Sequence, residues 1–253
     1  MQRIVSFLPS ATEIACALGL ADSLVGITHE CDYPPEVREK PVVVRNVLPI
    51  ERMSQSEIDR AVAERMHEGQ SLYQIDEDLL RTLDPDLILT QNLCQVCAPS
   101  GNEVSQVIKT LGRAPEILWL TPQSLSEIFD NVRELGAATG RTAEADALVN
   151  DCQKRLETLA QRTEGLPKPK VFCMEWLDPI YCSGHWVPEM LQVAGAEPVL
   201  ACAGAPSVRV TWAQIEAAAP QVVVFMPCGY GLQAAAEEAS RTLVGRPELA
   251  GVE

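Results

Sequence analysis

The sequence repeats one order of elements in its two halves, and this repetition restricts the fold more than any single motif. In the first half, an apolar run at residues 4–8 leads into a helical pattern, and a later run at 87–90 opens into a loop. In the second half, the runs at 170–175 and 222–225 repeat this order. Short apolar runs that alternate with helical patterns are typical of parallel sheets. We therefore predict an α/β fold with two Rossmann-like lobes, each with a parallel sheet.

A stretch without strand signal separates the two halves. From residue 142 to 163, apolar side chains recur on one face of a helix, at Ala145, Leu148, Val149, Cys152, Leu156 and Leu159. Such a helix is roughly 33 Å long and rigid. We expect an N-terminal lobe at 1–121, linking helices at 122–166 and a C-terminal lobe at 167–253, with a ligand cleft between the lobes, since open parallel sheets bind ligands beyond the carboxyl ends of their strands.

Composition excludes several classes of function. The chain has 35 acidic and 20 basic residues, a net charge of -15, which repels nucleic acid and anionic membrane surfaces. No apolar run reaches the roughly 20 residues of a membrane span, and no export leader precedes the first strand. The nine cysteines show no disulfide-type spacing. We expect a cytoplasmic protein with reduced thiols, or a periplasmic one if a leader has been removed.

The sharpest local motif is Cys94-Gln95-Val96-Cys97, because two thiolates at this spacing can chelate one soft metal ion or form a redox pair. Cys31 and Cys228 each follow a predicted strand and are candidate further ligands. The sequence therefore allows a metal ion or an iron-sulfur cluster. The alternative is that these four cysteines are small buried hydrophobic residues.

A second unusual segment follows the predicted strand that ends at Thr28. It contains an imidazole, two carboxylates, a thiol and a phenol within five residues, 29–33. A neutral imidazole such as His29 can ligate a metal or cobalt centre, and Glu30 can orient polar groups of a ligand. The alternative is a turn that Asp32 and the following prolines hold in place.

The third segment, residues 175–186, follows a strand of the second half. It concentrates Trp176, Tyr181 and Trp186 in a chain with only 5% aromatic residues, next to His185. Flat aromatic side chains bind planar ligands at low entropic cost, so we predict a ligand contact here. Packing of one tryptophan against the linking helix is the alternative. Weaker aromatic candidates for ligand contacts are Tyr73 and Tyr230.

Common catalytic and nucleotide-binding motifs are missing. The sequence has no GxGxxG, no P-loop, no GxSxG and no HExxH. Nucleotide binding, serine hydrolysis and zinc-dependent proteolysis therefore lose their usual support, and we expect a binding protein rather than an enzyme. An enzyme that uses an activated thiolate on a cofactor fragment remains a third alternative.

Several segments, read in order, resemble one family. These are Arg3-Ile4-Val5-Ser6, Leu8-Pro9-Ser10, Thr12-Glu13, Val25-Gly26-Ile27-Thr28, Asp32-Tyr33-Pro34-Pro35, Pro85-Asp86-Leu87-Ile88 and residues 187–196. The chain resembles the cobalamin-binding proteins among the substrate-binding proteins of ABC importers for cobalamin, haem and ferric siderophores. The segment from Thr28 to Pro34 and the Leu-Cys-x-Val-Cys element at 93–97 resemble a subgroup without an export leader.

The resemblance implies two lobes joined by a long helix, and cobalamin or another corrinoid as the ligand. Aromatic residues that contact the corrin ring in exported relatives are replaced here by Glu30 and Gln91, so Gln91 joins the predicted ligand-binding residues. An ABC permease is the implied partner, docked through Glu77 or Asp78, whereas Ala213 stands where the second docking glutamate is expected. Relatives also continue with another strand and helix, so the resemblance implies an incomplete C-terminal lobe.

The leading hypothesis is a corrinoid-binding protein. Aromatic faces would come from the second lobe, and His29, Glu30, Gln91 and the cysteine loop would supply polar or metal contacts. The alternative from a different class is a cytoplasmic metal or iron-sulfur protein that uses Cys31, Cys94 and Cys97.

Overall fold

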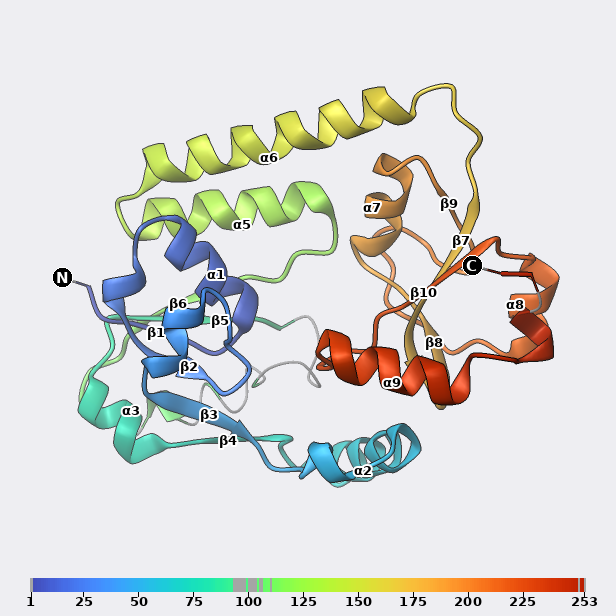
Figure 1. The fold of residues 1–253 in the computed structure, drawn as a ribbon. Helices are drawn as coiled ribbons and strands as arrows, with labels where there is room; N and C mark the ends of the chain where they lie inside the picture. The colour runs from blue at the N-terminus through green and yellow to red at the C-terminus, as the bar shows by residue number, and fades with distance from the viewer. Residues whose placement is uncertain are drawn as a thin grey trace. The chain divides into compact units, whose positions relative to one another are not determined.

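The computed structural model describes the chain except residues 1, 93–98, 100–103, 105, 106, 110, 250 and 253, and for Glu51 it describes the backbone alone. The chain divides into two compact units. Unit 1 comprises residues 1–122 and 127–150, and unit 2 comprises residues 123–126 and 151–253. Figure 1 shows the ribbon with the labels used below. No helix within the described ranges combines the length and the apolar character that a membrane span requires.

Unit 1 is built on a six-stranded sheet with the order β4-β3-β2-β1-β5-β6. All pairs are parallel except β3 with β4, which is antiparallel. The strands are β1 Ile4–Ser6, β2 Leu24–Thr28, β3 Val42–Asn46, β4 Tyr73–Ile75, β5 Leu87–Thr90 and β6 Glu116–Trp119. The helices are α1 Pro9–Ala17, α2 Gln55–His67 and α3 Glu77–Leu83, with short 3-10 helices at Ala21–Ser23, Pro35–Glu39 and Ile50–Arg52.

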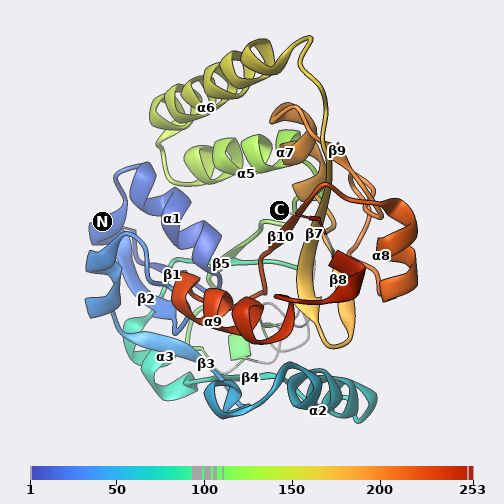
Figure 2. The ribbon, with the colours of Figure 1, turned by 45° about the vertical axis from the view of Figure 1, so that its right-hand side comes forward.

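Alternating side chains of the central strands fill two separate cores, one on each face of this sheet. Ile4 packs on one face with residues of α1 and α5. Its neighbour Val5 packs on the other face with residues of α3. Leu87 and Ile88 divide between the same two cores. This period of two explains why both strands read as continuous apolar runs: helices cover both faces of the sheet (Figures 1 and 2).

Helices α5 Leu125–Ala138 and α6 Thr142–Thr163 each contribute residues to both units. Within unit 1 they approach closely, since a Cβ on Gly136 would lie 2.5 Å from the Cβ of Ala145. A larger residue at 136 would therefore push the two helices apart. The long helix begins and ends at the residues that its apolar spacing predicted, whereas its rigidity stays a prediction.

Unit 2 contains a smaller sheet in which β7 is the central strand. β10 and β9 pair with β7 in parallel, and β8 pairs with it antiparallel. The strands are β7 Lys170–Leu177, β8 Ile180–Cys182, β9 Glu197–Pro198 and β10 Val222–Phe225. The helices are α7 Val187–Val193, α8 Trp212–Ala218 and α9 Leu232–Thr242, followed by a 3-10 helix at Pro247–Leu249.

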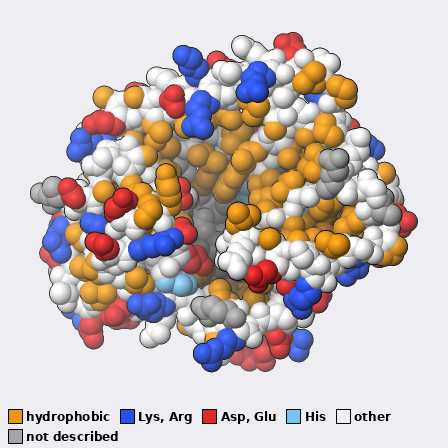
Figure 3. All heavy atoms as spheres, in the orientation of Figure 1, with side chains coloured by type: hydrophobic (Ala, Val, Ile, Leu, Met, Phe, Trp, Pro, Cys, Tyr) orange, Lys and Arg blue, Asp and Glu red, His pale blue; other side chains and the backbone are white. Residues whose placement is uncertain are grey.

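The two faces of this second sheet also carry separate cores. Phe172 and Met174 of β7 pack with Ile215 of α8, and we call this side the α8 face. Val171 and Cys173 pack with residues of α7, and we call this side the α7 face. Hydrophobic side chains gather over β10 and its neighbouring segments on the side of unit 2 shown in Figure 3, where Val224 exposes 39% of its surface.

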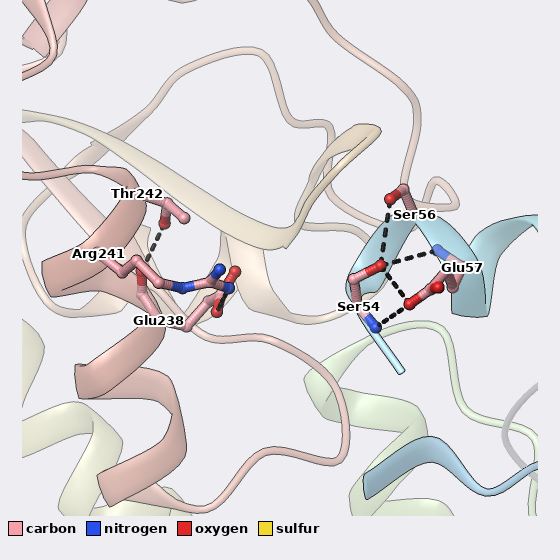
Figure 4. Close-up of polar contacts among 6 residues, drawn as sticks. All are labelled: Ser54, Ser56, Glu57, Glu238, Arg241 and Thr242. Carbon is pink, nitrogen blue, oxygen red and sulfur yellow. Dashed lines mark hydrogen bonds and ion pairs between the residues drawn. The ribbon is translucent and has the colours of Figure 1, made fainter. Parts of the chain in front are cut away.

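Local polar contacts fix several helix ends (Figure 4). Ser54 and Glu57 form the predicted capping box at the start of α2, with the Ser54 N–H donating to Glu57 Oε2 at 2.7 Å. In α9, Arg241 pairs with Glu238, and Thr242 Oγ1 donates to the Glu238 carbonyl. The prediction that Ser10 caps α1 is wrong, because that helix begins one residue earlier at Pro9 with Leu8 as the cap.

The predicted α/β class, with two mostly parallel sheets and one long helix, is confirmed. The sequence patterns did not predict β3, β4, β8 and β9, which have only two to five residues each. Short strands of this kind are stabilised by their neighbours in the sheet rather than by their own sequence.

Candidate functional site

Three predicted ligand residues of unit 1 follow parallel strands at one edge of its sheet. His29 and Glu30 come directly after β2, and Gln91 comes directly after β5. Only β1 lies between these two strands. Because carboxyl ends of parallel strands meet at the same edge, the structure places the three residues along that edge. All three are partly exposed and therefore accessible.

The carboxyl group of Glu30 is held in an unfavourable environment for its charge. Partial burial raises its pKa above the ordinary value of 4.5, and the positive charge of neighbouring His29 opposes this shift. The His29 ring lies with Nδ1 3.2 Å from Thr28 Oγ1. Burial also raises the pKa of Glu13, and the carboxylate of Asp32 adds to that shift. This edge therefore gathers carboxylates that proton or cation donors of a ligand would stabilise.

The cysteines predicted as metal ligands do not form a site within the described residues. Cys31 is 4% exposed, and its Sγ lies 3.0 Å from Thr12 Oγ1. Burial raises the pKa of the Cys31 thiol, which disfavours the thiolate that a metal needs. Cys228 is exposed in unit 2, and Cys94 and Cys97 lie outside the described residues. Where side chains are described, no three histidine, cysteine or acidic residues are placed to hold a metal ion.

Tyr73 has little surface available for a ligand. Its side chain belongs to a core of unit 1 and exposes 7% of its surface, at the first position of β4. We therefore leave Tyr73 out of the site proposed below.

In unit 2, an irregularity in β7 decides where the first tryptophan lies. Met174 pairs with Cys182 and Trp176 pairs with Tyr181, so Glu175 is an extra residue on β7 that has no partner position on β8. Such a bulge re-aims the side chains that follow it. Strict alternation from Met174 would direct Trp176 into the core on the α8 face. The bulge instead directs Trp176 to the α7 face.

The cores of unit 2 confirm this assignment of faces. Leu177, which follows Trp176, packs in the core of the α8 face. Ile180 and Cys182, on either side of Tyr181, pack in the same core. Since neighbouring residues of a strand point to opposite faces, Trp176 and Tyr181 both lie on the α7 face. The same reasoning applies to Arg209, whose neighbour Val210 packs on the α8 face.

These residues form a row across the α7 face, which we call the aromatic row: Tyr230, Trp176, Tyr181 and Arg209. The Tyr230 ring stands edge-on to Trp176, with ring centroids 6.0 Å apart. Trp176 and Tyr181 are cross-strand partners. Arg209 Nε donates to Tyr181 Oη at 2.8 Å, and its guanidinium carbon lies 5.4 Å from the ring centroid. The rings are only partly buried, so a flat ligand can reach them.

The loop after β8 holds His185 in a strained conformation. His185 has φ 53°, in the left-handed region that non-glycine residues rarely adopt. Its N–H donates to the Ala205 carbonyl at 2.6 Å, and its carbonyl accepts from the Gly204 N–H. Gly184 makes this approach possible, because a Cβ there would lie 2.3 Å from the Ser207 nitrogen. The His185 and Trp186 rings lie 5.9 Å apart at the start of α7.

Glu175 links this loop to β7. Its Oε2 accepts a 2.5 Å hydrogen bond from Ser207 Oγ, and its Oε1 accepts from the Gly184 N–H at 3.4 Å. Burial, together with the nearby Glu175 carboxylate, raises the pKa of Cys173 to about 11, so this thiol stays protonated. The bulged residue is thus part of the polar network under the aromatic row.

Sequence reasoning missed Glu175, Ser207 and Arg209 as site residues. A signal was available for two of them. Residues 207–210 alternate polar and apolar, Ser-Val-Arg-Val, which is the pattern of a half-buried strand. This segment pairs with β8 through the Cys182 N–H to Val208 carbonyl bond and the Val210 N–H to Ile180 carbonyl bond, both 3.0 Å.

Comparison with known proteins adds a family to this geometry. A model of the family described as "Periplasmic binding protein" matches residues 4–253 of this chain. A vitamin B12-binding protein of Vibrio vulnificus (strain YJ016) is 27% identical over 229 residues, which cover 90% of this chain and 72% of that protein.

Solved structures share the fold. The periplasmic vitamin B12-binding protein BtuF of Vibrio cholerae superposes with a TM-score of 0.69 at 24% identity, over 99% of this chain and 83% of that one. A periplasmic haem-binding protein from Pseudomonas aeruginosa gives a TM-score of 0.73 at 19% identity, over 99% of this chain and 80% of that one. At these identities the two structures support the fold alone.

Proposed function

The chain belongs to the periplasmic binding protein family, and we propose that it binds cobalamin or a related corrinoid as the substrate-binding component of an ABC importer. Relatives described as vitamin B12-binding proteins support the choice of ligand class. The proposal concerns binding and not catalysis.

The observation that carries the proposal is the aromatic row of unit 2. Tyr230, Trp176 and Tyr181 present partly exposed rings on one face of the sheet, and the bulge at Glu175 is what directs Trp176 there. Aromatic surfaces held by a sheet bind a large planar ring with little loss of conformational entropy. His185 and Trp186, on the clamped loop after β8, extend this set. The edge residues of unit 1, His29, Glu30 and Gln91, stay predicted polar contacts.

Cellular location and partner follow from the family rather than from the composition. Structural neighbours are described as periplasmic, and a relative of Bacillus subtilis is described as an ABC transporter substrate-binding lipoprotein. We therefore favour the periplasmic alternative over a cytoplasmic protein. An ABC permease is the partner that this role requires.

The proposal is tested by calorimetric titration of the protein with cyanocobalamin. Trp176→Ala is expected to weaken binding by about 2 kcal/mol, roughly 30-fold, which is typical of a central aromatic contact. Trp212→Ala is the matched control, because Trp212 belongs to the core of the opposite α8 face. Circular dichroism establishes that both variants are folded.

Equal affinities of the wild type and Trp176→Ala, or equal losses in Trp176→Ala and Trp212→Ala, would show that the aromatic row does not form the binding surface. Absence of binding by the wild type would overturn the corrinoid assignment itself.

A further inference from the structure

The aromatic row ends in a positive charge. Arg209 is exposed on the segment that pairs with β8, and its Nε–H donates to Tyr181 Oη. The hydrogen bond and the ring contact at 5.4 Å fix the direction of the guanidinium relative to the row. Guanidinium groups held in this way are suited to carboxylate and phosphate oxygens, because their N–H donors form a planar fork.

The spacing of the strands places this charge at the rim of the row. Trp176 is on β7, Tyr181 is its partner on β8, and Arg209 is on the segment beyond β8. Two strand spacings separate Trp176 from Arg209, about 10 Å. A flat tetrapyrrole-type ring that covers Trp176 and Tyr181 would therefore bring its peripheral substituents to the guanidinium.

The nearby carboxylate does not cancel this preference for an anion. Both oxygens of Glu175 accept hydrogen bonds from the protein, from Ser207 Oγ and from the Gly184 N–H. These bonds hold the negative charge of Glu175 against the loop after β8. Arg209 itself is engaged with the neutral ring of Tyr181, so its charge is not neutralised by this contact.

We propose that Arg209 is a specificity-determining residue that binds an anionic substituent, a carboxylate or a phosphate, at the edge of the ligand ring. The inference rests on the proposed corrinoid-binding function and adds the charge of the preferred ligand. It assigns ligands with an acidic periphery a higher affinity than neutral ligands with the same ring.

Three corrinoids with the same axial cyanide distinguish the sources of negative charge. Cobyrinic acid has carboxylate side chains, cobalamin has amide side chains with one phosphodiester, and cobinamide has amide side chains without a phosphodiester. The dissociation constant of each is measured for the wild type, Arg209→Gln and Arg162→Gln. Arg162 is the matched control, because it is an exposed arginine of unit 2 in the last turn of α6 and its replacement removes the same charge.

Arg209→Gln is expected to weaken binding of an anionic corrinoid about tenfold and to leave cobinamide within twofold. A loss with cobyrinic acid alone identifies a carboxylate as the recognised group, and a loss with cobalamin alone identifies the phosphate. The loss should shrink at high salt, whereas Arg162→Gln should leave all three affinities unchanged.

Equal changes for all three corrinoids, or no change for any of them, overturn the role of Arg209 while leaving corrinoid binding in place. Failure of the wild type to bind all three overturns both this inference and the proposed function.

Discussion

His185 carries backbone strain at a residue that ligand binding would use. A non-glycine residue at φ 53° costs on the order of 1 kcal/mol, and the contacts with Gly204 and Ala205 maintain it. We predict that His185→Gly raises the free energy of unfolding by up to about 1 kcal/mol. The same variant should bind corrinoid more weakly, because it removes the imidazole beside Trp186. Urea unfolding and calorimetric titration measure the two effects.

Ala219→Gly is the matched control for this trade-off. Ala219 has φ 48° at the exposed C-terminal end of α8, where glycine is the favoured residue. This variant should also gain stability, but its affinity should not change. If His185→Gly loses stability or keeps full affinity, the strain at residue 185 has no role in binding.

Glu30 predicts a pH dependence of stability. Burial raises its folded-state pKa above the ordinary 4.5, so the folded protein binds a proton at a higher pH than the unfolded chain does. Stability from this group is therefore gained as the pH falls through the folded-state pKa towards 4.5, and it is lost as the pH rises.

We predict that Glu30→Gln is more stable than the wild type at neutral pH and gains less stability on acidification. Urea unfolding from neutral pH to about 4.5 measures this difference. Glu216→Gln, an exposed glutamate in α8, serves as the control and should follow the wild type. Parallel curves for Glu30→Gln and the wild type would contradict the assigned effect of burial.

At the scale of elements, the start of α2 offers a direct test of local sequence signals. Ser54→Ala removes the hydroxyl of the capping box and is expected to lower the free energy of unfolding by about 1 kcal/mol. Ser56→Ala, two residues later, should change it by less than about 0.5 kcal/mol. Chemical denaturation of the two variants measures the difference, and equal values would show that the capping box does not stabilise the helix.

Elements with strong periodic signals could be predicted from the sequence. The apolar runs gave β1, β5, β7 and β10, and the 3.6-residue spacing gave α6 with its correct ends. The bulge at Glu175 could not be predicted, because register arises when β7 and β8 pair and not from the residues of either strand alone. The positions of Trp176 and Arg209 on one face depend on that register, so the site was only partly predictable.

At the scale of the whole molecule, resemblance in the order of motifs identified the family that the comparison over residues 4–253 confirms. Composition was a weaker guide. Net charge and missing motifs excluded classes of function, but the expectation of a cytoplasmic location gives way to the periplasmic alternative that the relatives favour. Local patterns identify candidate side chains, whereas their combination into a binding surface depends on tertiary pairing.

Thermal unfolding with and without cyanocobalamin is the most direct measurement of corrinoid binding. A ligand that binds only the folded state at a hundredfold excess over its Kd stabilises the protein by about 2.7 kcal/mol. For a chain of this size we therefore predict a rise in Tm of roughly 5–10 °C. An unchanged Tm with saturating cyanocobalamin, cobinamide and cobyrinic acid would contradict the proposed function.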